Sequence, residues 1–192
     1  MISLRGESAW SFYTSAGGGG GFGAFLLSGG MFVLKDLEGK LQSFDYGGFG
    51  IGMSYPLPKL LRLPQLTLPT ITLRGQEFGA TGSIADFPSD GIVYVTDACH
   101  GSDLTAQQLE GGVIYFDGGL GWLRGYGGSV LLAGIKKELL EMGIMIPSLM
   151  RLAIASAPAV IVMRGQNEGL QQSAGADFML GQIQWEGIYR DD

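Results

Sequence analysis

The sequence has very little of the two residue types that most often carry nucleophilic or metal-binding chemistry. Cys99 is the only cysteine and His100 is the only histidine among 192 residues. An intrachain disulfide is therefore excluded. This fits a reducing compartment, although a chain with a core of this size needs no disulfide anywhere.

Charge is also scarce, and basic charge most of all. Charged residues make up 16% of the chain, where about 25% is usual. Acidic residues outnumber basic ones by 18 to 12, so the formal net charge is −6. The basic residues form no cluster. Nucleic-acid binding is excluded on this ground, because binding to a phosphate backbone needs a cluster of basic residues. Charge would also add little to the binding of an anionic membrane.

A cleavable secretory signal is absent from the start of the chain. Residues 1–15 contain Arg5 and Glu7 and no continuous apolar run. We therefore expect a protein that is cytoplasmic as synthesised. Export by a route that uses no cleavable signal peptide stays open.

Glycine is what the sequence has in excess. It supplies 34 of the 192 residues, while 46% of the chain is hydrophobic and the mean hydropathy is +0.24. The glycines keep no three-residue period, which excludes collagen, and the hydrophobic content excludes simple disorder. Such a composition is typical of a β protein with strands buried on both faces, or of a protein that presents apolar surface to a membrane or a partner.

The pattern along the chain predicts one mainly β domain over residues 1–192, an antiparallel barrel or sandwich. A short helical pair near 135–157 is expected to cap one end, because Pro147 suits a first helical position and Gly143 a helix end. A further short helix is expected over Asp103–Glu110, capped by Asp103. The expected strands are near 22–34, 41–54, 67–74, 92–96, 112–117, 120–132, 159–164 and 176–188.

Two weakly charged stretches have the length of a membrane span. Ser15–Leu34 carries no charge over 20 residues, but eight of them are glycine, which disfavours a helix. Met142–Met163 contains Arg151 and two prolines, which makes insertion costly. We interpret the first stretch as a buried strand preceded by a turn, and the second as a buried helix-turn-helix.

Glycines concentrate in the expected strands 41–54 and 120–132, where backbone rather than side chain would form the surface. Internal packing is the favoured explanation, and an open face that binds a partner is the alternative. The residues that we expect to contact such a partner are aromatic and lie in the glycine-rich segments: Phe22, Phe25, Phe49, Trp122 and Tyr126.

The one local cluster of reactive residue types is Asp97–Asp103, after an expected strand. A nucleophilic Cys99 needs a base within hydrogen-bond reach. Adjacent strand residues point to opposite faces, so only a loop would bring His100 to it. The spacing of Asp97, His100 and Asp103 matches no strong zinc signature, and no cofactor motif occurs. The favoured explanation is a turn whose polar side chains cap backbone groups.

Two short resemblances are present. Ala16–Met53, about a fifth of the chain, is similar to the glycine-rich core of lipid-binding SYLF domains. Leu4–Gly6 and Gln184–Glu186 are similar to the arginine and glutamate motifs of some ADP-ribosyltransferases, whose serine-threonine-serine element is missing here. Neither resemblance covers enough of the chain to assign a family.

We therefore predict a non-enzymatic interaction module for an apolar partner, either a protein surface or a lipid membrane. A bacterial effector or toxin that inserts into membranes is its most concrete form. A toxin-like transferase or hydrolase that uses Glu186, Cys99 or His100 is the alternative. A structural subunit that forms homo-oligomers is a third possibility. No metal, cofactor or nucleic acid is expected in any of them.

Overall fold

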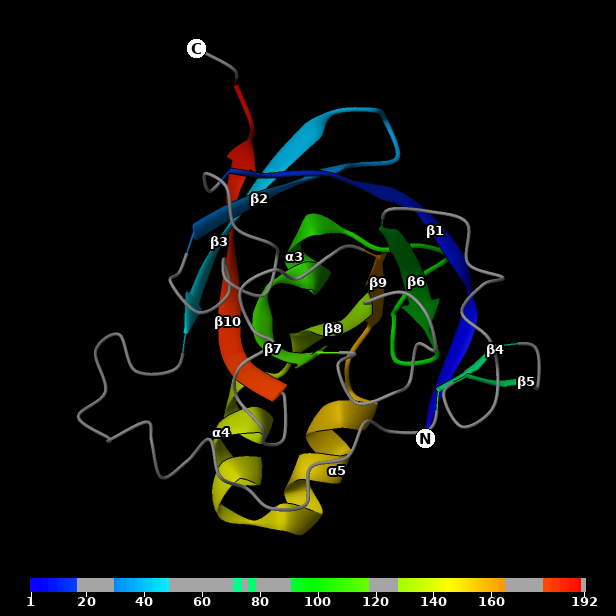
Figure 1. The fold of residues 1–192 in the computed structure, drawn as a ribbon, viewed down its shortest axis with the longest axis vertical. Coiled ribbons are helices and arrows are strands. Elements are labelled where there is room, and N and C mark those ends of the chain that lie inside the picture. Colours follow the sequence, from blue (N-terminus) through cyan, green and yellow to red (C-terminus); the bar gives the residue numbers. More distant parts are fainter. Residues whose placement is uncertain are drawn as a thin grey trace.

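The strands form a closed ring, seen end-on in Figure 1. The computed structural model describes residues 1–16, 30–48, 71–73, 76–78, 91–117, 128–164 and 178–190. The ring runs in the order β1, β2, β3, β10, β7, β8, β9, β6 and back to β1. The bounds of its strands are β1 Ile2–Ala16, β2 Gly30–Lys35, β3 Leu41–Gly48, β6 Ile92–Thr96, β7 Gly111–Asp117, β8 Gly128–Ile135, β9 Ala159–Arg164 and β10 Phe178–Ile188.

Every pairing within this ring is antiparallel. Two short strands, β4 (Ile71–Leu73) and β5 (Gln76–Phe78), extend the sheet beside the start of β1, and β4 is parallel to β1. Closure pairs each strand of the ring with two neighbours, which removes the open edges of a sheet. The expected antiparallel β architecture is confirmed, in its barrel form.

The inside of the barrel is filled by side chains. Along β6, Val93 and Val95 face inward while Tyr94 between them faces outward, as the two-residue period of a strand requires. The short helix α3 (Ala106–Leu109) lies inside the ring and adds two of its residues to this core. The buried inner residues, drawn from all eight strands, α3 and the turn before it, are Trp10, Phe32, Leu34, Phe44, Val93, Val95, Cys99, Leu104, Ala106, Leu109, Val113, Tyr115, Leu131, Ala133, Ala159, Ile161 and Ile183.

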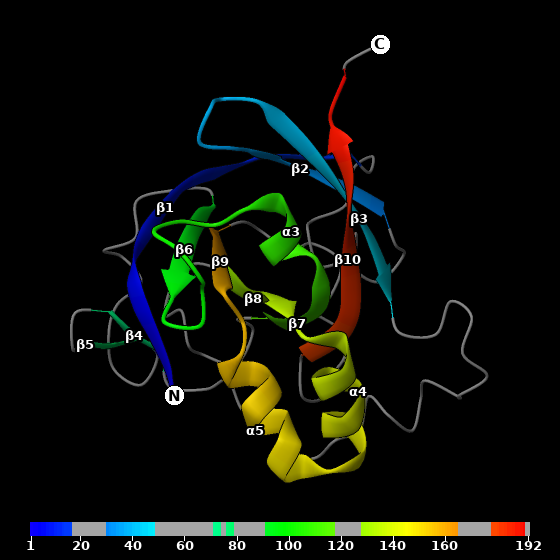
Figure 2. The ribbon, with the colours of Figure 1, turned by 180° about the vertical axis from the view of Figure 1, so that it is seen from behind.

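A second core lies between the barrel wall and the helical hairpin formed by α4 (Lys137–Met145) and α5 (Pro147–Ala155). Outward-facing residues such as Ile114, Leu132 and Val160 pack with Leu140 and Ile154 of the helices. The expected helical pair is confirmed, but its expected position is wrong: it covers the outside of the wall and does not cap an end (Figure 2). Within the described ranges, no helix has the length and hydrophobicity needed to cross a membrane.

Three further details differ from the sequence-based expectations. The longest strand, β1, was not expected at all. Thr105, not Asp103, caps α3, because its hydroxyl accepts the backbone N–H of Gln108 while the Gln108 side chain accepts the N–H of Thr105. Gly143 does not end α4 but lies inside it, where an added Cβ would come within 2.8 Å of the Met150 Cα on α5.

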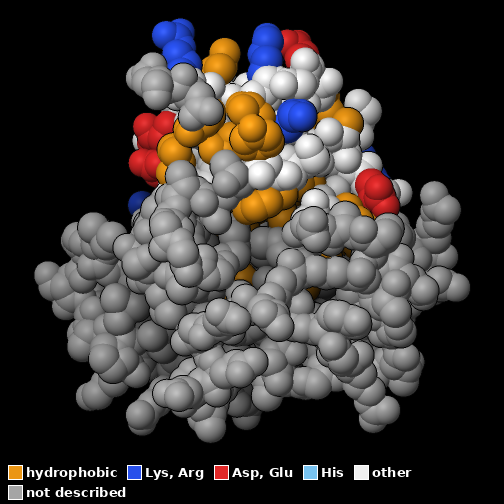
Figure 3. Space-filling view, turned by 45° about the horizontal axis from the view of Figure 1, so that its top comes forward, with side chains coloured by type: hydrophobic (Ala, Val, Ile, Leu, Met, Phe, Trp, Pro, Cys, Tyr) orange, Lys and Arg blue, Asp and Glu red, His pale blue; other side chains and the backbone are white. Residues whose placement is uncertain are grey.

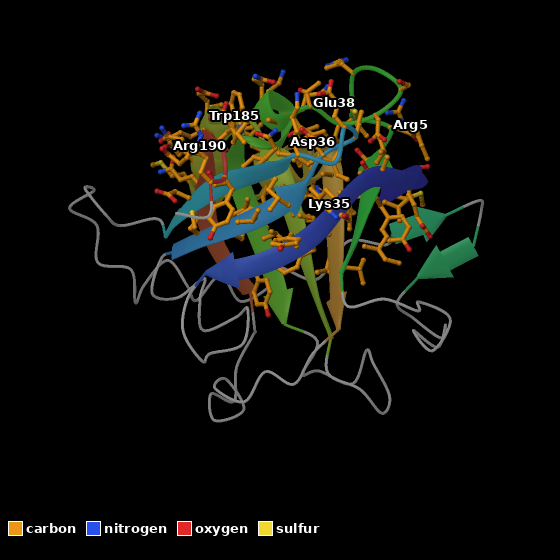
Figure 4. All side chains as sticks on the ribbon, turned by 90° about the horizontal axis from the view of Figure 1, so that it is seen from above. Arg5, Lys35, Asp36, Glu38, Trp185 and Arg190 are labelled. Atoms are coloured by element: carbon orange, nitrogen blue, oxygen red, sulfur yellow. The ribbon has the colours of Figure 1, made fainter. Side chains whose placement is uncertain are left out.

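The barrel has two different rims because its strands alternate in direction. We call the end that holds residues 36–40, between β2 and β3, and residues 97–105, between β6 and α3, the turn rim. At the opposite rim β1, β3, β7 and β9 end and β2, β6, β8 and β10 begin. Figure 4 shows the barrel from the side, with the turn rim at the top.

Tyr94 belongs to the second core, between the barrel wall and the helical hairpin, which we call the outer core. This tyrosine makes the stability of the protein depend on pH in the alkaline range. Its side chain is 1% exposed, and burial together with the negative charge of Glu7 raises the pKa of its hydroxyl to about 12. In the unfolded chain the same group ionises near pH 10. The folded state thus keeps a proton that the unfolded state loses, and stability falls as the pH rises from about 10 to about 12.

We expect wild type to lose about 2–3 kcal/mol of unfolding free energy over this range through Tyr94. Urea unfolding of wild type and Tyr94→Phe at a series of alkaline pH values measures this loss. The unfolding free energy of wild type minus that of the variant should fall as the pH rises, since the variant lacks the ionisable group. A constant difference from pH 9 to 12 would show that Tyr94 does not titrate abnormally.

Candidate functional site

The turn rim gathers the reactive residue types that the sequence singles out. Asp103 is its main hydrogen-bond acceptor. One carboxylate oxygen accepts hydrogen bonds from the Ser8 hydroxyl and from the backbone N–H of Leu104, at 2.7 Å for the latter, and the other accepts the N–H of Ala9 at 2.9 Å. Asp103 therefore ties the turn to β1, and its oxygens are occupied by structural contacts.

Trp10 of β1 holds the same turn from inside the barrel. Its indole N–H donates to the backbone oxygen of Leu104 at 2.9 Å in a buried setting. The ring meets Phe44 edge-on, with centroids 6.3 Å apart, and Phe44 stacks on Phe32 at 5.3 Å. The backbone of the turn is thus fixed by the aromatic core.

Cys99 lies in this turn as part of the core. Its side chain is buried, and Sγ lies 3.6 Å from the backbone oxygen of Asp103 and 3.8 Å from Oε1 of Gln108. His100 is exposed, and its backbone oxygen accepts a hydrogen bond from the Gln108 side chain at 2.6 Å. The thiol contacts oxygens of the turn and of Gln108, as a thiol that stabilises a turn would.

A second hydrogen-bonded group closes the turn rim beside β3. Asp36 accepts the side-chain N–H of Gln42 at 2.8 Å and the backbone N–H groups of Glu38 and Lys40 at 2.9 and 2.8 Å. Slight burial raises the pKa of Asp36, but these hydrogen bonds and the charge of Lys40 outweigh it, so the pKa lies below its ordinary value. The hairpin is therefore tightened by an ionised carboxylate.

The same group reaches β10 through Trp185. Its indole N–H donates to Oε1 of Gln42, and its backbone N–H donates to Oε1 of Glu110, both at 3.0 Å. The register of β10 against β3 shifts between Trp185 and Gly187, which marks a β-bulge. Glu186, within this bulge, is exposed.

The structure does not bring the arginine and glutamate of the ADP-ribosyltransferase-like motifs together. Arg5 lies on β1 and donates to the backbone oxygen of Gly101 at 2.9 Å, whereas Glu186 lies on β10. Two strands separate β1 from β10 in the ring. Figure 4 shows Arg5 and Trp185, the neighbour of Glu186, on opposite sides of the turn rim.

The other candidate residues lie elsewhere. Phe22, Phe25, Phe49, Trp122 and Tyr126 are outside the described residues. In the described ranges, His, Cys, Asp and Glu side chains do not gather in the groups of three that could hold a metal ion.

Sequence reasoning missed the hydrogen-bonded group formed by Asp36, Gln42, Trp185 and Glu110. Its contacts join residues up to 143 positions apart. The only local signal was the acidic residue at the start of the expected hairpin, which is typical of a turn.

No protein-family model matches the chain, and no solved structure matches it. A curated protein does: over 187 residues the chain is 30% identical to the toxin protein Tse4 of Pseudomonas aeruginosa. The match covers 92% of this chain and 94% of that protein. Matching lengths indicate that the two proteins share the whole domain and not a short motif. The chain belongs to the family of the toxin protein Tse4.

Proposed function

We propose that the protein is a toxin that acts on a lipid membrane and not by catalysis. Membership of a toxin family supports the toxin part of this proposal. The membrane part is supported by one observation above all. A chain of 192 residues with only 16% charged residues contains an uncharged stretch, Ser15–Leu34, of 20 residues.

The geometry favours action at the outer surface of the barrel. The described interior is filled by its own side chains, many of which are fully buried. A partner would therefore meet the outside of the molecule, where hydrophobic side chains lie between acidic and basic ones (Figure 3). Burial of such apolar side chains is what drives association with a membrane.

The uncharged stretch is anchored in the barrel at both of its ends. Ser15 pairs with Phe32 and Ala16 with Met31, as β1 leaves the barrel and β2 enters it at the opposite rim. The turn rim, with its hydrogen-bonded carboxylates, is at the other end. Phe32 and Leu34 of this stretch are buried in the inner core, so a membrane contact would use the residues that precede β2. Such a contact would leave the hydrogen bonds of the turn rim in place.

Flotation with phosphatidylcholine–phosphatidylglycerol vesicles, combined with dye release, tests the proposal. We expect the wild-type protein to float and to release the dye. Phe22→Asp with Phe25→Asp should weaken both, whereas Leu37→Asp, at an exposed leucine of the turn rim, should change neither. A protein that remains at the bottom of the gradient and releases no dye would refute membrane action.

The alternative enzyme hypothesis predicts that toxicity depends on Cys99, His100 or Glu186, whereas the membrane proposal predicts that it does not. We expect Cys99→Ala, His100→Ala and Glu186→Ala, made separately, to leave toxicity to producing bacteria unchanged. Cys99 contacts oxygens of its own turn and of Gln108. Glu186 lies on β10, which does not pair with β6, the strand that leads into the Cys99–His100 turn. Growth curves at matched protein levels measure the effect, and circular dichroism confirms folding. Loss of toxicity in any folded variant would favour catalysis.

A further inference from the structure

The helical hairpin carries four exposed apolar side chains, three of them at its end and the fourth, Leu152, further along α5. Met145 is 84% exposed, Leu152 57%, Ile146 49% and Met142 44%. We call these four residues the hairpin tip surface. They are half of the large hydrophobic residues that are exposed in the described ranges, the others being Met1, Tyr13, Leu37 and Ile188.

Charge is sparse in the residues that follow Met142. Residues 142–150 contain no charged side chain, and Arg151, which is exposed, is the only one between 142 and 163. Lys137 and Glu141 of α4 lie 3.9 Å apart and offset each other, and Glu141 directly precedes Met142. The tip beyond Met142 carries no acidic group, and Glu138 and Glu141 lie on α4 within one helical turn before it. The long side chain of Arg151 can reach the phosphate of a lipid headgroup.

The backbone at the turn between the helices has hydrogen-bond partners within the hairpin. The N–H of Ile146 donates to the oxygen of Met142 at 2.8 Å, and that of Leu149 donates to the oxygen of Ile146 at 2.9 Å. Pro147, at the first position of α5, has no N–H. Unpaired backbone donors oppose transfer into lipid, and these two donors are paired.

The hairpin is also placed to make such a contact. In Figures 1 and 2, α4 and α5 form one end of the molecule along its longest axis. Leu140, Met150 and Ile154 fix them on the barrel wall. The close packing of Gly143 against Met150 joins the two helices. A firmly held apolar tip therefore points away from the barrel.

We propose that the hairpin tip surface is the site at which the folded protein first docks on a lipid bilayer. Met142, Met145, Ile146 and Leu152 enter the headgroup region and Arg151 binds lipid phosphate. The hairpin is too short to span a bilayer, and it acts as an interfacial anchor. This inference rests on the proposed membrane function, and it identifies the surface through which contact with the membrane begins.

Vesicle flotation of charge variants tests the docking surface with the whole protein. Met145→Lys and Ile146→Lys should each lower the partition onto phosphatidylcholine–phosphatidylglycerol vesicles by about tenfold. Leu37→Lys is the matched control, since Leu37 is 53% exposed on another part of the molecule, and its partition should equal that of wild type. Arg151→Gln should weaken binding, and Arg151→Lys should restore most of it.

A fluorescent label gives a second readout that does not depend on affinity. In a Cys99→Ala background, a polarity-sensitive dye attached to Met145→Cys should shift to shorter wavelength when vesicles are added, and one on Leu37→Cys should not. If wild type floats but both lysine variants float equally well and the dye at 145 does not shift, the tip inference is overturned while the membrane function stands. If wild type does not float, both fail.

Discussion

Replacing Gly134 with alanine is expected to destabilise the protein by more than about 4 kcal/mol, the largest effect of any single substitution proposed here. Gly134 lies near the end of β8 with a φ of +76°, and a Cβ placed there would lie 2.0 Å from the backbone oxygen of Gln108. The same Cβ would also lie 2.6 Å from Cγ of Pro158. A backbone oxygen and a proline ring cannot move aside cheaply, so α3 would be pushed away from β8.

Gly39 provides a matched control for this prediction. It lies in the β2–β3 turn with a φ of +80°, and nothing lies within 4 Å of an added Cβ. Gly39→Ala therefore introduces the backbone strain without the collision, at a cost of about 1–2 kcal/mol. Urea unfolding followed by circular dichroism compares the two variants. Equal destabilisation would mean that α3 is not held against β8 as closely as the structure shows.

The sequence predicts the barrel well where strands alternate regularly, and poorly where a bulge interrupts the alternation. β1 is the clearest case. Ile2 and Leu4 at its start belong to the outer core, whereas Trp10 belongs to the inner one. The register against β6 shifts between Leu4 and Gly6 and again between Glu7 and Ser11. These bulges move the apolar side chains to the other face of the strand. Together with the polar residues between them, they interrupt the alternation from which a strand is predicted.

The candidate site was predictable only in part, for a different reason. The turn 97–103 could be recognised from its polar residues, and its structural role follows from local capping rules. The partners of the turn could not be recognised, because Ser8 and Trp10 lie 95 and 94 positions away in the sequence from the residues that they bind. Closure of the barrel, which places β1 beside β6, creates these contacts, and a local pattern does not contain that information.

The helical hairpin shows how a correct element can still leave its role open. Pro147 and the apolar spacing predict the two helices, but they do not say which apolar residues are covered. The wall of β7, β8 and β9 covers one face, including Leu140 and Ile154, and leaves Met145 exposed. An apolar residue that packing leaves in water is what a docking surface requires.

Replacing Trp10 with alanine is expected to destabilise the protein by about 3–5 kcal/mol, since the ring is 4% exposed and fills the inner core beside Phe44. The substitution also leaves the backbone oxygen of Leu104 without its indole donor. Trp10→Phe separates these two effects, because it keeps an aromatic ring and removes only the N–H and part of the volume. Its cost should be smaller, about 1–3 kcal/mol.

Cys99 reports where that cost arises. It is the only cysteine, it is 6% exposed, and its sulfur lies against the backbone oxygen of Asp103, the residue before Leu104. If Trp10 holds the turn, both variants should make Cys99 react faster with a thiol reagent under native conditions. Gly39→Ala, which strains a different turn, should leave the rate unchanged. Equal thiol reactivity in Trp10→Ala and wild type would mean that the turn keeps its shape without the indole. The hydrogen bonds from Ser8 and Ala9 to Asp103 would then be sufficient to hold it.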